Sequence, residues 1–548
     1  MNKVSLLDCT LRDGAYVVDG KFGKEAMCGI ILKLQEACVD IIECGWLKDA
    51  PHEEGSSFYH VPSDLERYLV APKRAGSVYT VMIDWNRYDL AQLPPCDGKS
   101  IDAIRVVFPS EHYREGIALA EPIRDKGYQV YFQAANTLGY SDDDLLNMIE
   151  LINKVKPVSI SVVDTFGAMY ADDLVRIASL VHQHLQPEIA LGFHSHNNLQ
   201  LSFAMCMEFV KIFKNQKRSL IVDSSLCGMG RGAGNAPTEL LADYLIKSCE
   251  AQYDMNRILD AIDMYMSHYL ENYQWGYSVP YYISGTLCAH VNNIAYLTKT
   301  HRTGAHDMKA ILETIASDER TQYDYNKLEK IYVEYQTHKV DDSQAMLELG
   351  KRLQGKSVLL LCPGETSRTY KDEIDAFIAT EKPVVIGVNA VFPEYQCDAL
   401  FFSNALRLQY ACEVNASAIQ KAQLIVTSNL RDHDQLAKSP YVLNYTELIK
   451  RGWKHFDNST ILCLRMLKKL GTSHITLAGF DGYNEATANH YIDPVLQTKL
   501  DTAQRKLLNE EITQMFADFM HGFAKPNTVC FLTPSKFAPM DADAKSTF

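Results

Sequence analysis

The sequence lacks the features that identify several common classes of protein. Its fourteen cysteines form no Cys-x-x-Cys pair, and some, such as Cys9, Cys38 and Cys362, lie within apolar runs. This pattern argues against a zinc ribbon or a disulfide framework and favours reduced, buried thiols. No apolar run is long enough to span a bilayer, and the charged Asp8 and Arg12 interrupt the stretch where a signal peptide would be apolar. We therefore expect a cytoplasmic protein with no membrane partner.

An excess of positive charge is also missing. Lys and Arg number 54 against 68 Asp and Glu, which gives a formal net charge of −14. A broad nucleic-acid surface is not expected, because such surfaces need clustered positive charge. What the sequence does have is the capacity to form cores, since 548 residues that are 47% hydrophobic are enough for two or three globular domains.

Eight short apolar runs recur along the first 230 residues, each separated from the next by a linking segment. The links at 24–38, 141–155 and 172–185 have helical character, whereas those around 47–77 and 85–102 resemble loops. Strands that alternate with helices predict a parallel sheet, and eight such units predict a closed (β/α)8 TIM barrel. The expected strands cover residues 4–8, 40–46, 78–84, 103–109, 129–135, 158–164, 189–196 and 220–225.

Polar side chains end or follow nearly every expected strand. Functional groups of such barrels lie at the carboxyl ends of the strands, so these side chains should gather on one rim and form an active site. They are Asp8, Arg12, Asp13, Glu43, Asp84, Gln133, Asn136, Asp164, His194, His196 and Asp223. The residues assigned to substrate binding are Asp8, Glu43, Gln133, Asp164 and Thr165.

Three of these groups predict a divalent metal site. His194 and His196 are two residues apart on one expected strand, so their side chains project to the same face. A histidine pair satisfied by core hydrogen bonds is the alternative. Asp13, after the first strand, would add a carboxylate, and one carboxylate with two imidazoles suits Mn²⁺, Mg²⁺ or Co²⁺. Arg12 beside it would place a permanent cation near a substrate oxyanion.

A glycine-rich loop follows the eighth strand. Four glycines in residues 228–234 permit backbone shapes that other residues avoid and allow close approach to a ligand. Asn235, at the end of this loop, could supply a further oxygen ligand to the metal.

Three motifs in the first 300 residues together resemble the metal-dependent aldolase and acyl-lyase barrel superfamily, which includes 4-hydroxy-2-oxovalerate aldolase, 3-hydroxy-3-methylglutaryl-CoA lyase and isopropylmalate synthase. The motifs are Asp8-x-Thr10-Leu11-Arg12-Asp13-Gly14, His194-x-His196-Asn197 and Gly228-x-Gly230…Gly234-Asn235-Ala236-Pro237-x-Glu239. The resemblance implies a divalent metal on Asp13, His194 and His196, with Asn235 as a fourth ligand. It also implies that Arg12 stabilises an enolate, and we expect a 2-oxo acid substrate and a homo-oligomer.

The chain departs from these families at two positions. The aldolases have a catalytic histidine shortly after the Arg-Asp pair, where this chain has Tyr16, and the lyases have a cysteine in the glycine loop, where this chain has Gly230-Arg231-Gly232. Tyr16 is therefore the candidate for proton transfer, since a metal and Arg12 nearby could lower the pKa of its phenol. A packing or substrate-orienting role for Tyr16 is the alternative.

The rest of the chain predicts a helical extension and a second domain, giving domains at 1–254, 255–354 and 355–548. Helical patterns cover 256–273, 308–315 and 336–353. From residue 355, apolar strands alternate with helices, which predicts a doubly wound Rossmann-like α/β fold. Its expected strands cover residues 357–362, 384–388, 399–402, 424–427, 475–478 and 528–532.

The second domain vaguely resembles bacterial sialyltransferase-like and pterin-pyrophosphokinase-like Rossmann proteins. The matching features are the Pro-Gly-x-x-Ser turn at 363–367, Val388-Asn389, and Ser459 followed by the Leu-Ala-Gly-Phe-Asp stretch at 477–481. A structural or partner-binding role is the alternative to ligand binding. The residues assigned to a nucleotide or sugar are Gly364, Ser367, Asn389, Ser459 and Asp481.

The function expected from these features is that of a class II pyruvate aldolase-like lyase. A 4-hydroxy-2-oxo acid would lose its 4-hydroxyl proton and split at the C3–C4 bond into pyruvate enolate and an aldehyde. The second domain suggests carbohydrate or surface-polysaccharide metabolism. Acyl-CoA lyase or synthase chemistry of the Claisen type, a glycosyltransferase-like enzyme working through the second domain, and a scaffold with an inactive barrel are the alternatives.

Overall fold

The computed structural model describes residues 3–299, 301, 303–430, 439–455, 458–485, 495, 500–522 and 529–538. The chain forms two compact units, Met1–Tyr325 and Asn326–Phe548, each with hydrophobic clusters of its own. The three-part division with boundaries after residues 254 and 354 stays a prediction. Among the described residues, no helix combines the length and the apolar character needed to cross a membrane.

A closed parallel barrel is the centre of the first unit, which confirms the predicted TIM barrel. Within the described residues its eight strands follow the order β1-β9-β8-β7-β6-β5-β4-β2, and pairing of β1 with β2 closes the ring. The short β3 (Phe58–Tyr59) pairs with β2 outside the ring. The barrel strands are β1 (Val4–Asp8), β2 (Ile41–Leu47), β4 (Val78–Asp84), β5 (Ala103–Phe108), β6 (Gln129–Ala134), β7 (Ser159–Asp164), β8 (Ala190–Ser195) and β9 (Leu220–Ser224).

The two-residue period of the strands places an apolar layer of side chains and a polar layer of side chains inside the barrel. Ile41, Ala103 and Ile221 belong to a small apolar cluster, and the residues two positions further along these strands are Glu43, Arg105 and Asp223. Alternate side chains of a strand point to the same face, so these charged side chains lie in the interior, one layer closer to the carboxyl ends. The intervening residues pack outward on the helices.

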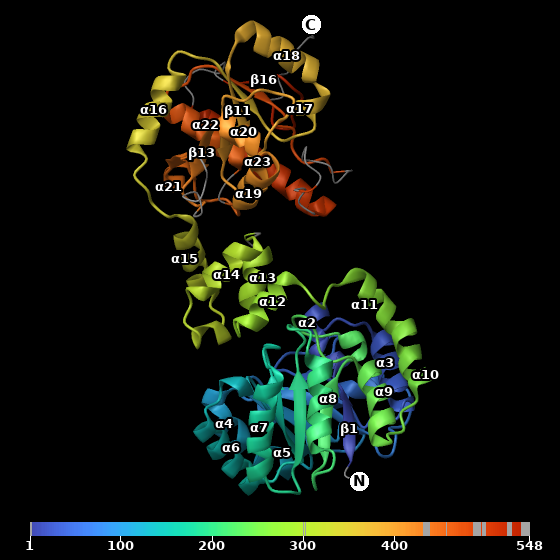
Figure 1. Ribbon diagram of the computed structural model, residues 1–548. Helices are drawn as coiled ribbons and strands as arrows, with labels where there is room; N and C mark the ends of the chain where they lie inside the picture. Colours follow the sequence, from blue (N-terminus) through green and yellow to red (C-terminus); the bar gives the residue numbers. More distant parts are fainter. Residues whose placement is uncertain are drawn as a thin grey trace. The chain divides into compact units, whose positions relative to one another are not determined.

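Helices surround the barrel, as the lower part of Figure 1 shows for the first unit. In α6 the buried Leu145, Met148, Ile149 and Ile152 form one helical face, and Ser141 caps its first turn through Asp144 N. The links at 47–77 and 85–102 contain only β3 and the 3₁₀ turns Pro62–Tyr68 and Leu90–Gln92, as expected of loops. The helices are α1 (Thr10–Asp13), α2 (Ala15–Val18), α3 (Lys24–Glu36), α4 (Tyr113–Ala118), α5 (Ala120–Asp125), α6 (Asp142–Val155), α7 (Ala171–His184), α8 (Ser202–Phe213) and α9 (Thr238–Cys249).

Two of the three helical predictions after the barrel are confirmed. The segment 256–273 is helical over residues 255–272 with a π-helical turn over Ile262–Met266 inside it, and the helix expected over 308–315 is α14. The helix expected over 336–353 begins only at Ser343, whose backbone N–H donates to Asp341 Oδ1 (3.0 Å); such local bonds compete with a helix. The elements are α10 (Met255–Ala261), α11 (Ser267–Asn272), α12 (Val279–Thr286), α13 (Val291–Lys299), α14 (Ala305–Glu313), the 3₁₀ turn Glu319–Thr321, α15 (Tyr325–Gln336) and α16 (Ser343–Leu353).

The second unit is built on a parallel sheet with helices on both faces, as predicted. Among the described residues its order is β14-β13-β12-β11-β10-β15-β16. Helices α16, α22 (Ser459–Lys469) and α23 (Thr502–His521) cover one face, and α18 (Lys371–Glu381), α19 (Ala405–Val414) and α20 (Ala416–Lys421) cover the other. The sequence analysis missed β14, and Thr528 of the last expected strand lies outside the described residues. The strands are β10 (Val358–Leu361), β11 (Val384–Val388), β12 (Ala399–Phe402), β13 (Gln423–Thr427), β14 (Tyr441–Leu443), β15 (Ile475–Ala478) and β16 (Val529–Phe531).

Candidate active site

The end of β8 and the turn after β1 bring three donor side chains together. His194 lies within β8, His196 follows it, and Asp13 ends the single helical turn α1. One donor atom from each residue lies within 4.8 Å of the other two, and all three residues are buried. These are the three residues predicted to hold the metal.

The donor atoms around Asp13 are arranged as a cation would require. The imidazole of His196 has Nδ1 against the backbone oxygen of Asp164 (3.3 Å), so its Nε2 lone pair faces Oδ2 of Asp13 at 3.3 Å. Asn235 donates Nδ2 to the same oxygen (2.7 Å). The Oδ1 of Asn235 and the Nε2 of His196 are buried without a hydrogen-bond partner among the described residues. Buried polar atoms normally have a partner, so these two indicate a bound group that contacts them. Carboxylate, imidazole and amide donors fit a divalent cation.

Arg12 fixes the Asp13 carboxylate from the opposite side. Its Nη1 donates to Oδ1 of Asp13 (2.5 Å) and its Nε donates to Oε2 of Glu43 (2.8 Å). Trp46 donates Nε1 to the backbone oxygen of Arg12 (3.0 Å) and so holds the turn itself. The guanidinium is therefore oriented by two carboxylates before any ligand arrives.

Arg105 extends this network to the second metal donor. Its Nη1 donates to Oε2 of Glu43 (2.7 Å) and its Nη2 donates to Oδ2 of Asp223 (2.5 Å). That same Asp223 oxygen lies 3.1 Å from Nδ1 of His194. Because β2, β5 and β9 are not neighbours in the sheet, these bonds cross the barrel interior. The sequence analysis did not assign Arg105 a role; the signal for it was an arginine inside an apolar strand, which needs carboxylates when buried.

Burial and these ion pairs set the protonation states around the site. Burial by itself would raise the pKa of Asp13 and of Asp223, but Arg12 and Arg105, respectively, hold both below their ordinary value. Burial lowers the pKa of His194, so its ring is neutral at neutral pH. Ionised carboxylates and neutral imidazole are the forms that bind a cation.

The glycine loop closes over these donors without room for side chains. A Cβ atom on Gly230 would lie 2.4 Å from Oδ2 of Asp13 and 2.3 Å from Nδ2 of Asn235. Gly234 has a positive φ of +85°, and a Cβ atom there would meet the backbone oxygen of Gly228 at 1.9 Å. Glycine at these positions lets the loop backbone approach the metal donors.

Comparison with known proteins agrees with this geometry. A family model described as HMGL-like matches residues 109–264, which include both histidines and Asn235. This segment is therefore similar to HMGL-like proteins.

Named relatives of this chain include aldolases and a decarboxylase. It is 27% identical over 272 residues to 4-hydroxy-2-oxovalerate aldolase 2 of Comamonas testosteroni, covering 48% of this chain and 74% of that protein. It is 26% identical over 261 residues to oxaloacetate decarboxylase of Mycobacterium tuberculosis, covering 47% and 74%. Among solved structures, HMG-CoA lyase of Brucella melitensis shares 15% identity with a TM-score of 0.38, covering 50% of this chain and 100% of that chain.

Tyr16 lies at the mouth of the barrel and is 51% exposed. Its ring packs edge-on against Trp46 (centroids 6.2 Å apart). The surrounding protein atoms raise the pKa of the phenol, and the guanidinium of Arg231 offsets this only in part. Tyr16 is therefore a neutral phenol at neutral pH.

Arg231, in the glycine loop, stands beside Tyr16. Its guanidinium carbon lies 5.0 Å from the centre of the Tyr16 ring, its Nη2 donates to Nε2 of His290 (2.5 Å), and its backbone N–H donates to Oδ2 of Asp13 (3.3 Å). The two positions at which the chain departs from the aldolase and lyase motifs are thus in contact. The sequence analysis assigned no role to Arg231 or His290.

The residues assigned to substrate binding bond to the protein itself. Both oxygens of Asp8 are occupied, by Thr10 N (2.9 Å) and Thr238 Oγ1 (2.5 Å). Asp164 accepts from the backbone N–H groups of Ala168 (2.8 Å) and Met169 (3.3 Å). Burial raises the pKa of both carboxyl groups to about 6. These contacts build the rim, and direct contact with substrate stays a prediction.

The other assigned residues are also engaged. Gln133 donates Nε2 to Ser161 Oγ (2.8 Å), and Thr165 Oγ1 accepts from Asn136 N (2.7 Å). Glu43 joins the two arginines but keeps a buried Oε1 without a partner among the described residues.

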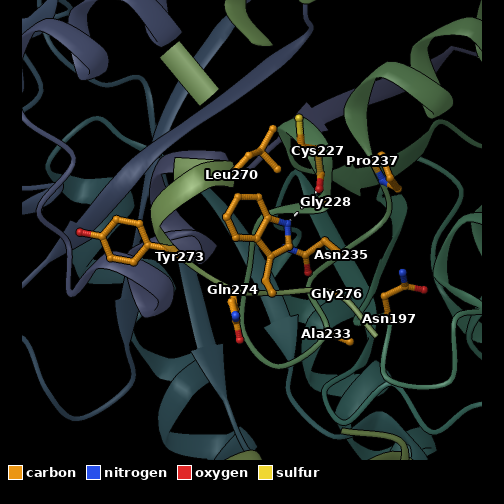
Figure 2. Close-up of a pocket in the computed structure, with 11 residues that line it drawn as sticks. Asn197, Cys227, Gly228, Ala233, Asn235, Pro237, Leu270, Tyr273, Gln274 and Gly276 are labelled. Atoms are coloured by element: carbon orange, nitrogen blue, oxygen red, sulfur yellow. Dashed lines mark hydrogen bonds between the residues drawn. The ribbon is translucent and has the colours of Figure 1, made fainter. Parts of the chain in front are cut away.

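A pocket of about 410 Å³ lies beside Asn235. Figure 2 shows Asn197, Asn235 and Pro237 on one side of it and Leu270 and Tyr273 on the other. The indole N–H of Trp275 donates to the backbone oxygen of Cys227 (3.0 Å) and ties the segment after α11 to the glycine loop. None of the described residues that line the pocket is charged: Asn197, Cys227, Gly228, Ala233, Asn235, Pro237, Leu270, Tyr273, Gln274, Trp275 and Gly276.

The candidate ligand residues of the second unit lie at the carboxyl ends of its strands. Ser367 Oγ donates to the backbone oxygen of Gly364 (2.8 Å), and Asp481 accepts from the backbone N–H of Thr366 (2.8 Å). Asn389 donates to Ser459 Oγ, next to the start of α22. The structure therefore gathers Gly364, Ser367, Asn389, Ser459 and Asp481 along one edge, and their role in binding a nucleotide or sugar stays a prediction.

Proposed function

We propose that this chain is a divalent-metal-dependent carbon–carbon lyase that splits a 4-hydroxy-2-oxo acid into pyruvate and an aldehyde, or joins them. The HMGL-like family match and the aldolase and decarboxylase relatives support a metal-dependent enzyme of the aldolase or lyase class. The observation that carries the proposal is the unsatisfied contact between His196 Nε2 and Asp13 Oδ2, with the orphaned Asn235 Oδ1 beside it.

The residues that would hold the metal are Asp13, His194, His196 and Asn235. When bound, a Mn²⁺, Mg²⁺ or Co²⁺ ion supplies Lewis acidity, which stabilises negative charge on a carbonyl oxygen. Which of these ions the site prefers is part of the proposal, since oxygen and imidazole donors suit all three.

Arg12 is the proposed stabiliser of the pyruvate enolate. Two of its nitrogens are bound to Glu43 and Asp13, and Nη2 has no partner among the described residues. That remaining N–H group can donate to an oxygen that gains negative charge during cleavage. A donor held in place beforehand stabilises the transition state without reorganisation.

Tyr16 is the proposed proton-transfer residue. As a neutral phenol it can donate a proton, which suits the condensation direction, where the new C4 alkoxide takes up a proton. In cleavage the same path would run in reverse. A histidine in its place would be a stronger base at neutral pH, so we expect a pH optimum on the alkaline side.

A screen for pyruvate release tests the proposal. Full-length protein with added Mn²⁺ is incubated with 4-hydroxy-2-oxo acids, and pyruvate is measured with a coupled dehydrogenase. We expect release that a chelator abolishes and that Arg12→Ala reduces about 100- to 1,000-fold. The control Arg176→Ala removes an exposed arginine of α7 and should retain activity. Pyruvate release that survives both the chelator and Arg12→Ala would refute the proposal.

Claisen-type acyl-CoA chemistry is the alternative reaction at the same donors. The described lining of the pocket beside Asn235 offers no positive charge for the phosphates of coenzyme A, which favours the aldol reaction. Release of free thiol from acyl-CoA substrates, measured in the same screen, distinguishes the two reactions.

For the second unit we propose a polar small-molecule site at the carboxyl edge of the sheet. The observation in its favour is that five polar or glycine positions meet where the strand order reverses beside β10. Thermal-shift measurements with nucleotides and sugar nucleotides test this, and Asn389→Ala should remove any shift. Binding of a sugar nucleotide would support a role in carbohydrate metabolism. Turnover of that sugar nucleotide would support a glycosyltransferase.

The proposed location is the cytoplasm and the proposed assembly is a homo-oligomer. All fourteen cysteines are among the described residues, and none forms a disulfide, as expected of a reducing compartment. Analytical ultracentrifugation of the purified chain tests the oligomeric state.

A further inference from the structure

Arg231 is a positive charge at the mouth of the barrel, and no carboxylate in the described part of the chain neutralises it. Its guanidinium forms no ion pair with any described residue within 4 Å, whereas Arg12 and Arg105 each pair with two carboxylates. Arginine is charged at all physiological pH values. A half-buried guanidinium without a counter-ion is unusual, because burial of a charge is costly unless it is paired.

The neighbours of Arg231 hold it in place but leave its charge uncompensated. Nε2 of His290 lies 2.5 Å from Nη2 of Arg231 and Nδ1 lies 3.1 Å from the backbone nitrogen of Asn292, and a neutral ring can accept a hydrogen bond at only one of these two nitrogens. Burial and Arg231 itself lower the pKa of His290 to about 2, so the ring is a neutral acceptor. The π face of Tyr16 provides the second support. Both groups orient the guanidinium, and neither cancels its charge.

Arg231 is also close to the metal donors. Its own backbone N–H donates to Oδ2 of Asp13, so its side chain starts at the donor set and extends toward the half-exposed Tyr16. A substrate whose 2-oxo acid end lies at Asp13 would extend its other end along this direction. The described lining of the pocket beside Asn235 carries no charge, whereas Arg231 places a guanidinium beside Tyr16.

We propose that Arg231, oriented by His290 and Tyr16, binds a second anionic group of the substrate, located on the part that leaves as the aldehyde. The substrate class is then a 4-hydroxy-2-oxo acid whose tail carries a carboxylate or a phosphate. This inference rests on the proposed function, because it assumes that the 2-oxo acid end lies at the metal donors. Guanidinium groups suit either anion through paired N–H donors.

Binding of substrate analogues that cannot be cleaved tests the inference without catalysis. The matched pair is 2-oxoglutarate and 2-oxopentanoate, which share a five-carbon chain and differ at C5, a carboxylate in one and a methyl group in the other. Isothermal titration calorimetry on the Mn²⁺-loaded full chain should show that 2-oxoglutarate binds about 10- to 100-fold more tightly, as expected for a charged hydrogen bond. Arg231→Gln should remove most of that preference.

Two further variants separate recognition from structural damage. Arg231→Lys keeps the positive charge but not the paired N–H donors. It should therefore show a preference for 2-oxoglutarate between those of the wild type and Arg231→Gln. Arg176→Gln makes the same chemical change on exposed α7 and should keep the full preference. If Arg231→Gln weakens both ligands equally, Arg231 binds the shared 2-oxo acid end and the inference is wrong; equal binding of both ligands by the wild type would also overturn it.

Cleavage assays distinguish a carboxylate tail from a phosphate tail. They also separate failure of the anion site from failure of the proposed lyase reaction. Pyruvate release is compared for 4-hydroxy-2-oxovalerate, for 4-hydroxy-2-oxoglutarate and for a 4-hydroxy-2-oxo acid with a terminal phosphate. A higher kcat/KM for one charged substrate, lost in Arg231→Gln, identifies carboxylate or phosphate. Cleavage of 4-hydroxy-2-oxovalerate, whose tail is neutral, as efficiently as the two substrates with an anionic tail would refute the inference alone. Preferential binding of 2-oxoglutarate without any cleavage would refute the lyase reaction but leave the anion site standing.

Discussion

Arg105 lies between two carboxylates, and almost none of its own surface reaches solvent. Its side chain is 1% exposed, and those of Glu43 and Asp223 are 0% exposed. Such a buried network costs desolvation energy, which its members recover only while all are present. We interpret Arg105 as a positioning residue, because it reaches His194 through Asp223 and Arg12 through Glu43.

Substitution of Arg105 by methionine should therefore harm both stability and metal binding. It leaves the buried Asp223 without a cationic partner and Glu43 with Arg12 alone, so we expect the free energy of unfolding of the barrel to fall by about 3–5 kcal/mol. Mn²⁺ affinity should fall as well, because Asp223 no longer orients His194. Denaturant unfolding and calorimetric titration measure the two effects. Arg176→Met, at an exposed ion pair, should change neither; wild-type values for Arg105→Met would contradict the interpretation.

Asp8 gives the stability a pH dependence of defined sign. Its pKa is raised from 3.8 to about 6 in the folded chain, so between these values the folded state holds a proton that the unfolded state has lost. Its contribution to stability therefore falls as pH rises from about 4 to about 6. Asp8→Asn lacks this titration, and its stability relative to wild type should rise by up to about 3 kcal/mol between pH 4 and pH 7.

Thermal unfolding at both pH values measures this difference. Asp164, whose pKa is also about 6, is present in both chains and cancels in the comparison. Asp172→Asn, on the exposed face of α7, serves as the matched control and should show no pH-dependent difference. A constant difference between Asp8→Asn and wild type at all pH values would show that Asp8 titrates normally.

At the level of elements, the glycine loop after β9 connects the metal donors to the mouth of the barrel. Gly230 leaves no space for a methyl group next to Asp13 and Asn235. Gly230→Ala should displace one of these donors and weaken Mn²⁺ binding at least about 10-fold. Calorimetric titration measures the affinity. Gly304→Ala, where nothing lies within 4 Å of the added carbon, is the control; equal affinities in both variants would contradict a tight loop.

The elements of the barrel could be predicted because local patterns encode them. Each of the eight strands is an apolar run, and the two-residue period of β8 placed His194 and His196 on one face before the fold was known. The contacts of Arg105 could not be predicted, since it meets Glu43 and Asp223 at sequence separations of 62 and 118 residues. Those pairs follow from closure of the barrel, which no local pattern specifies. The pairing of Arg231 with His290, 59 residues apart, was missed for the same reason.

The late start of α16 also has a local cause. The sequence predicted one helix over 336–353, but residues 337–342 include Asp341, whose side chain binds the backbone two residues on. Amphipathic spacing continued through this segment and concealed the break. Hydrophobic period alone is therefore a weak guide to where a helix begins.

For the whole molecule, two units with separate cores predict two separable unfolding events. The metal donors belong to Met1–Tyr325, and the second parallel sheet belongs to Asn326–Phe548. A ligand stabilises only the unit that binds it, by about 2.7 kcal/mol at a concentration 100 times its Kd. Scanning calorimetry of the full chain should show that Mn²⁺ raises one transition and leaves the other unchanged. His194→Ala should abolish the shift, whereas His184→Ala, at an exposed position of α7, should keep it. A shift of both transitions would mean that the two units unfold together.

The account depends on a single cation held jointly by the first and last parts of the barrel. Anomalous diffraction at the manganese edge, from crystals of the full chain grown with Mn²⁺, tests this most directly. We predict one strong peak per chain, within bonding distance of Asp13, His194 and His196 and adjacent to Asn235, that is absent in His194→Ala. A peak elsewhere with these three side chains unliganded, or no peak at saturating Mn²⁺, would contradict the metal centre and with it the lyase.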